Sequence, residues 1–187
     1  MSAADARPLI VVGFDGSEGA VRAIAATTTL MPGAEALVVC VYRPVLPAAG
    51  AALLGAPAEF VRGGARALDA ERRAEAEQTA ERGAALAAAG GRASSALALA
   101  ATGAVWAAIE HLAQQQQAAA LVVGARGHSG LSRFVLGSVS SGLLHHATRP
   151  VLVVPDTHPA LRVDGDDTDH ASGRTLAGAL GRQTPRV

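Results

Sequence analysis

A glycine-rich stretch between two short apolar runs carries the residues best suited to chemistry. The apolar runs are Leu121–Val123 and Val151–Val154, and Gly124, Gly127 and Gly137 follow the first of them. Glycine lets the backbone approach a ligand closely, and a helix that begins at the serine after the last glycine would add N-terminal amides and a hydroxyl. The stretch therefore predicts an anion site, and phosphate is the favoured anion.

Each position in this stretch has its own physical use. Gly124 at a strand end admits a ribose or phosphate against the backbone, and Gly127 permits a turn that points its N–H inward. Gly137-Ser138 opens a helix whose dipole faces the anion, and Arg133 is a candidate phosphate clamp. From the spacing alone, a plain connecting loop with glycines for turn geometry is the alternative.

The first predicted strand ends in a second polar turn. Leu9–Phe14 is an uninterrupted apolar run, which is typical of a strand buried on both faces. Asp15-Gly16-Ser17 follows it, and Ser17 is expected to cap the next helix. Asp15 is either a residue of that turn or a ligand-binding carboxylate, and the residues alone leave both open.

Strands alternate with helices along the rest of the chain. This order predicts a parallel sheet with right-handed crossovers, and such sheets bind ligands at the carboxyl ends of strands, where the strand order reverses. If the first strand lies between the second and the fourth, Asp15 and Gly124 flank that crevice. The predicted strands are Leu9–Phe14, Ala36–Tyr42, Ser94–Ala100, Leu121–Val123 and Val151–Val154; the predicted helices are Glu18–Met31, Glu59–Ala89, one capped by Thr102, and Ser138–His146.

One folded domain is expected over residues 9–155. Residues 1–8 are expected to form a flexible lead, and the polar residues 156–187 a disordered tail. Within the first helix, the apolar face is predicted at Val21, Ile24, Ala25 and Thr28.

Composition excludes several classes of function. All 16 basic residues are Arg and balance 16 acidic residues, so the chain offers neither a catalytic lysine nor a basic surface for nucleic acid. Cys40 is the single cysteine, which excludes an internal disulfide and suits a buried thiol in a reducing compartment. No apolar run approaches the ~20 residues that span a bilayer. We expect a cytoplasmic protein without a membrane segment.

The glycine stretch resembles the nucleotide-binding signature of the universal stress protein family, in its ATP-binding branch. It reads G-x-x-G, nine residues, then G-S, between VVG and PVLVVP, and VVGFDGS at the first strand is also similar to the family. The resemblance implies an open parallel five-stranded sheet of order 3-2-1-4-5 with helices on both faces, which is Rossmann-like and similar to the adenine nucleotide alpha-hydrolases. It also implies ATP in the crevice and a homodimer formed through the last strand, Val151–Val154.

The resemblance further implies the contacts that each position makes. Asp15 would accept a hydrogen bond from the adenine amino group, Val41 would contact adenine through its backbone, and Gly13 and Gly124 would lie against the nucleoside. The phosphates would be held by Gly127, Gly137, Ser138 and Val139. Mg²⁺ on the triphosphate is compatible with this arrangement, but no carboxylate cluster specifies a metal site.

One departure from the family pattern concerns the basic residues of the loop. Many members carry His and Arg where this chain has Arg126 and His128. The residue after Gly127 is therefore a mostly neutral histidine near pH 7, which would weaken phosphate binding or make it pH-dependent. We expect Arg126 to compensate.

The favoured function is an ATP-binding stress-response regulator that acts through binding and dimerisation, with a protein partner that the sequence does not identify. No general base, nucleophile or catalytic lysine accompanies the predicted pocket, so no catalytic residue is assigned. The alternatives are a slow ATPase or nucleotidyl-transfer enzyme on the same fold, and a dimeric interaction module that binds no nucleotide.

Overall fold

The computed structural model describes residues 7–45, 58–127 and 136–156. Within these ranges strands and helices alternate along the chain, as predicted. The elements are β1 (Leu9–Gly13), α1 (Glu18–Leu30), β2 (Glu35–Tyr42), α3 (Ala58–Ala89), β3 (Ser94–Ala100), α4 (Val105–Gln115), β4 (Ala120–Gly124), α5 (Ser138–His146) and β5 (Val151–Val154). The predictions made for His128, Arg133 and the tail from residue 157 onward lie outside the described residues.

All five strands form one parallel sheet in the order β3-β2-β1-β4-β5, which confirms the predicted order. Strand β1 is central: Val11 pairs in register with Leu37 of β2 on one side and with Leu121 of β4 on the other. The chain order reverses between β1 and β4, so the carboxyl ends of these two strands frame the crevice where ligands bind such sheets.

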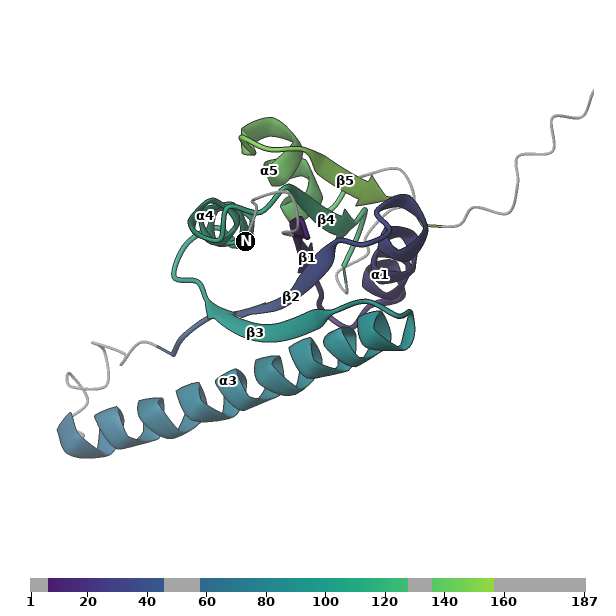
Figure 1. The fold of residues 1–187 in the computed structure, drawn as a ribbon. Helices are drawn as coiled ribbons and strands as arrows, with labels where there is room; N and C mark the ends of the chain where they lie inside the picture. Colours follow the sequence, from purple (N-terminus) through teal and green to yellow (C-terminus); the bar gives the residue numbers. More distant parts are fainter. Residues whose placement is uncertain (1–6, 46–57, 128–135, 157–187) are drawn as a thin grey trace, which may run out of the picture. The chain divides into compact units, whose positions relative to one another are not determined.

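The two faces of the sheet carry separate apolar cores. Ile10 and Val12 of β1 pack with α1 and α3, whereas Val11 between them points to the other face and packs with α4 and α5. Figure 1 shows α1 and α3 on one side of the sheet and α4 and α5 on the other. Because both faces are covered, the central strands are continuous apolar runs.

Helix α1 turns a different face to the sheet from the one predicted. Its buried residues include Ala20, Ala23, Ile24 and Thr27, whereas Val21 is 40% exposed. Ser17 caps the helix as predicted, since its hydroxyl accepts a hydrogen bond from the Ala20 N–H at 3.2 Å. The predicted face was wrong by about one residue because alanine gives little contrast between the sides of a helix.

The start of α4 also differs from its prediction. Its N-cap is Ala104, and no side chain caps it. The prediction that Thr102 caps this helix was therefore wrong. Among the residues that the structure describes, no helix combines the length and the apolar character needed to cross a lipid bilayer.

Candidate functional site

A cavity of about 330 Å³ lies at the carboxyl ends of β1, β2 and β4. Its volume lies at the lower end of the range of about 300–1,000 Å³ that is typical of small-molecule sites. Nine predicted site residues line it: Gly13, Asp15, Val41, Gly124, Arg126, Gly127, Gly137, Ser138 and Val139. Arg133 lies outside the described residues.

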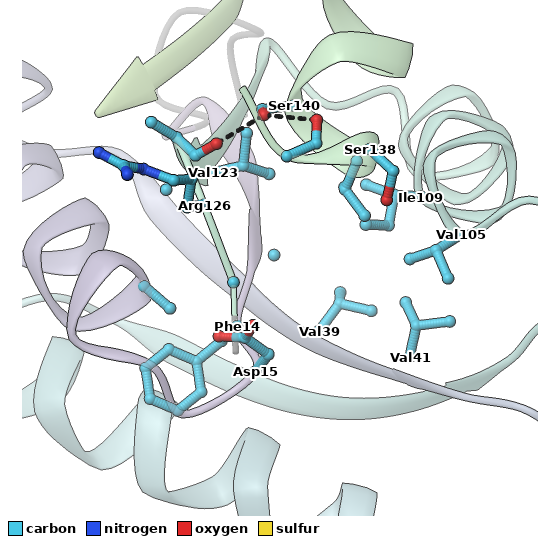
Figure 2. A pocket seen from close by; sticks show the side chains of 17 residues that line it. Phe14, Asp15, Val39, Val41, Val105, Ile109, Val123, Arg126, Ser138 and Ser140 are labelled. Atoms are coloured by element: carbon cyan, nitrogen blue, oxygen red, sulfur yellow. Dashed lines mark hydrogen bonds between the residues drawn. The ribbon is translucent and has the colours of Figure 1, made fainter. Parts of the chain in front are cut away.

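The cavity is also lined by eight residues that the sequence analysis did not identify as site residues: Phe14, Ala20, Val39, Val105, Ile109, Val123, Ala125 and Ser140. Figure 2 shows Val39, Val41, Val105 and Ile109 along one side. Most of the eight are apolar and were taken for core residues, because a cavity lining and a core have the same composition. Alternation along β2 was the available signal, since it places Val39 on the same face as the predicted Val41.

Asp15 begins the turn between β1 and α1. Its Oδ1 accepts a hydrogen bond from the Ser17 N–H at 3.0 Å, which is the turn role that the sequence offered as one alternative. The side chain is exposed and lines the cavity as well, so the turn positions the carboxylate there. Its charge also acts across the sheet: burial raises the pKa of the Cys40 thiol in β2, and Asp15 raises it further.

Gly127 lies directly against the Asp15 carboxylate. A Cβ added at Gly127 would overlap Asp15 Oδ2. Any side chain at this position would thus displace the carboxylate or the loop. Glycine at position 127 leaves room for the Asp15 carboxylate, a role different from the turn geometry that the sequence suggested.

A second pair of glycines brings α1 against the end of β4. A Cβ added at Gly124 would lie 2.7 Å from the carbonyl carbon of Gly19, and one added at Gly19 would lie 2.8 Å from the carbonyl oxygen of Arg126. Backbone therefore packs on backbone where the cavity begins. Gly19 gave no sign of this role in the sequence.

The N-terminus of α5 faces the cavity through Ser138, Val139 and Ser140. Gly137 is the N-cap, and its own N–H is already donated to the Ala125 carbonyl at 2.8 Å. The N–H groups of the next three residues have no acceptor within the helix. The helix dipole and these amides favour an anion at this end of the cavity.

Ser140 fixes the position of this helix start. Its buried hydroxyl lies 2.8 Å from the Ala125 carbonyl oxygen and 3.0 Å from that of Gly137, as the dashed lines in Figure 2 show. Ala125 in turn donates its N–H to Val154 of β5 at 2.8 Å. These contacts tie the end of β4, the start of α5 and β5 together.

Arg126 has its guanidinium in an ion pair. Arg126 Nε lies 2.6 Å from Asp156 Oδ2, and the other oxygen of Asp156 lies 2.5 Å from Arg22 Nη2 in α1. Arg126 therefore lines the cavity while its charge is held by a carboxylate. A phosphate that contacted this side chain would share the guanidinium with Asp156 or displace it.

The arrangement combines an apolar lining, a carboxylate and an anion-attracting helix end. Such a cavity can hold a molecule with a flat apolar part and a negatively charged part. Within the described ranges, no group of three His, Cys, Asp or Glu side chains is placed to hold a metal ion.

Both the sequence and the fold of this chain are similar to those of known proteins. The sequence model of the Universal stress protein family matches residues 8–155. The universal stress protein UspA from Lactobacillus plantarum has a similar structure, with a TM-score of 0.60 and 21% identity, covering 80% of this chain and 99% of that one. A universal stress protein from Archaeoglobus fulgidus gives 0.57 and 21%, covering 80% and 98%. A universal stress protein in complex with cAMP gives 0.54 and 25%, covering 80% and 98%.

Proposed function

This chain belongs to the universal stress protein family, and from that premise we propose that it is an ATP-binding regulatory protein that acts through binding rather than turnover. The observation that carries the proposal is the cavity between β1, β4 and α5, which nine of the ten predicted nucleotide contacts line. The cAMP complex of a related universal stress protein supports an adenine nucleotide as the ligand class.

The residues of the cavity fit such a nucleotide. Adenine would lie against the apolar side chains of Val39 and Val41, with its amino group donating to Asp15. The ribose would lie at Gly124, which lines the cavity. The phosphates would accept hydrogen bonds from the first-turn amides of α5 and from the Ser138 hydroxyl. Mg²⁺, when bound, would neutralise part of the charge on the phosphates.

The proposal gives Gly137 and the three residues that follow it different roles at the start of α5. Because Gly137 donates its N–H to Ala125, the phosphate donors are the amides of Ser138, Val139 and Ser140. Gly137 contributes through its shape, since a Cβ there would lie 3.3 Å from the Ala125 carbonyl oxygen.

The proposal includes a homodimer and a cytoplasmic location. Among the strands that the structure describes, β5 is an edge strand that pairs with β4 alone, and all of its four residues are partly exposed. A second copy pairing along this edge would satisfy its outward peptide groups. The free thiol of Cys40 suits a reducing compartment.

Isothermal titration of the full chain with ATP tests the proposal. We expect one site per chain in the wild type and its loss in Gly127→Val/Ser138→Ala, with the circular dichroism spectrum unchanged. Absence of binding at millimolar ATP would refute the proposal. Release of phosphate by the purified protein that is lost in Asp15→Ala would instead favour the slow ATPase.

A further inference from the structure

The side chain of Arg126 is paired with Asp156, which does not itself line the cavity. Asp156 accepts from Arg126 Nε at 2.6 Å and from Arg22 Nη2 at 2.5 Å. The three side chains are 20–28% exposed, so they are partly shielded from water. Charge-assisted hydrogen bonds in such surroundings are stronger than ion pairs on an open surface.

The backbone of Arg126, in contrast, lies at the anion-attracting end of the cavity. Its Cα is 3.5 Å from the position that a Cβ on Gly137 would take, and Gly137 is the N-cap of α5. Figure 2 shows the guanidinium directed away from Ser138 and from the apolar lining. A side chain whose Cα lies this close to the N-cap is attached to the chain beside the helix start, while its guanidinium is paired with Asp156.

The carboxylate of Asp156 would compete with a bound phosphate for the guanidinium of Arg126. One carboxylate serves two guanidinium groups, and Glu18, 3.5 Å from Arg22, is almost fully exposed. A triphosphate at the start of α5 would bring several negative charges close to Arg126. Two anions, Asp156 and the phosphate chain, would then compete for the same guanidinium.

We propose that Asp156 is a specificity-determining residue that withholds Arg126 from the ligand and so limits how much a triphosphate gains over a nucleoside. This inference rests on the proposed function, since it concerns the same cavity. It adds a residue that lies outside the cavity lining and outside the glycine motif. The discrimination between ATP and adenosine is set by the balance between the two anions.

Binding of adenosine, ATP and inorganic tripolyphosphate to four full-length proteins tests the inference: wild type, Asp156→Asn, Asp156→Asn/Arg126→Gln and Arg22→Gln. In Asp156→Asn the shape is kept and the charge is removed, so ATP affinity should rise by about three- to ten-fold. Adenosine affinity should stay within about two-fold. The gain should vanish in the double variant, because the guanidinium that provides it is absent.

Arg22→Gln is the matched control. It perturbs the same carboxylate but leaves Asp156 paired with Arg126, so the ratio of ATP to adenosine affinity should not rise. Thermal unfolding of all four proteins verifies that each is folded at the temperature of titration.

The outcomes separate this inference from the proposed function. If nucleotides bind but the ATP-to-adenosine ratio is the same in Asp156→Asn as in wild type, or its gain survives without Arg126, the inference is wrong and the function stands. If adenosine and ATP fail to bind while tripolyphosphate shows the Arg126-dependent gain, the function is wrong and the role of Asp156 stands. Binding of none of the three ligands by any variant overturns both.

Discussion

At the scale of single residues, the cavity depends on contacts between atoms that are far apart in the sequence. Asp15 and Gly127 are separated by more than a hundred residues, and yet the carboxylate occupies the space that a side chain on Gly127 would need. The adenine-binding and phosphate-binding parts of the proposed site therefore meet at one contact. A substitution in the phosphate-binding part should therefore change the affinity for adenosine as well.

Gly127→Ala tests this coupling. The added methyl group would displace Asp15, so we expect ATP affinity to fall by about ten-fold or more, and adenosine affinity to fall with it. Gly103→Ala is the control, because a Cβ at Gly103 meets nothing within 4 Å. Equal adenosine affinity in Gly127→Ala and wild type would show that the carboxylate does not need this space.

Glu110 is a buried carboxylate that joins α4 to the turn before β5. Its Oε1 accepts from the Thr148 hydroxyl at 2.7 Å, the Thr148 amide at 3.1 Å and the Gln114 amide at 3.0 Å. Burial raises the pKa of Glu110, but these hydrogen bonds and the charge of Arg149 outweigh it, so the pKa lies below its ordinary value of 4.5. The ionised form therefore stabilises the fold.

The lowered pKa of Glu110 predicts that its contribution to stability depends on pH. A carboxylate whose pKa is lowered by folding contributes stability above pH 4.5, and that stability is lost as the pH falls through the folded pKa. Glu110→Gln should lower the free energy of unfolding by about 1–3 kcal/mol at pH 7 and by less in acid. Urea unfolding measures this, with the half-exposed Glu77→Gln as control. A deficit that is independent of pH would contradict the assignment.

At the scale of elements, a buried arginine ends α1. Arg92, which is 8% exposed, donates to the carbonyls of Ala34, of Thr27 at 2.6 Å and of Met31 at 3.0 Å. The Thr27 carbonyl already accepts from the N–H of Met31, the C-cap of α1, at 2.9 Å, so this guanidinium adds a second donor at the C-terminal end of the helix. It also fixes the turn from α1 into β2.

Arg92→Lys tests this role. An ammonium group cannot reproduce the planar fork of donors, so the free energy of unfolding should fall by about 1–3 kcal/mol in urea. Arg82→Lys on the exposed surface of α3 should change it by less than about 0.5 kcal/mol. If both variants were equally stable, Arg92 would be a cavity filler rather than a cap.

The alternation of strands and helices along the chain could be predicted from the residues, and the strand order in the sheet from the family resemblance, whereas several contacts could not be predicted. Continuous apolar runs such as Leu9–Phe14 mark buried strands, and the glycine spacing marks the loop. The face of α1 was predicted wrongly because its many alanines give weak periodicity. The Arg126–Asp156 pair was not predicted, because pairing across 30 residues of sequence has no local pattern.

At the scale of the whole molecule, the edge of the sheet formed by β5 is the expected dimer contact. Leu121 N–H donates to the Pro150 carbonyl and Ala125 N–H to that of Val154, so alternate residues of β5 bond β4. The peptide groups of Val151 and Val153 then face outward. They are the groups that a second copy would pair with.

Val153→Pro should therefore separate the dimer while the monomer stays folded, because proline is tolerated where the N–H faces outward from an edge strand. Analytical ultracentrifugation measures the mass in solution. Val153→Ala, which keeps the N–H, should remain dimeric. A dimer that persists in Val153→Pro would place the contact elsewhere.

An amide-resolved NMR titration of the ¹⁵N-labelled protein with ATP tests most directly whether ATP occupies the cavity at the carboxyl ends of β1 and β4. We predict saturable shifts of the amides of Gly127, Ser138, Val139 and Ser140 at the phosphate end, and of Asp15 and Val41 at the adenine end. No shift at millimolar ATP, or shifts confined to residues outside the cavity, would contradict the account.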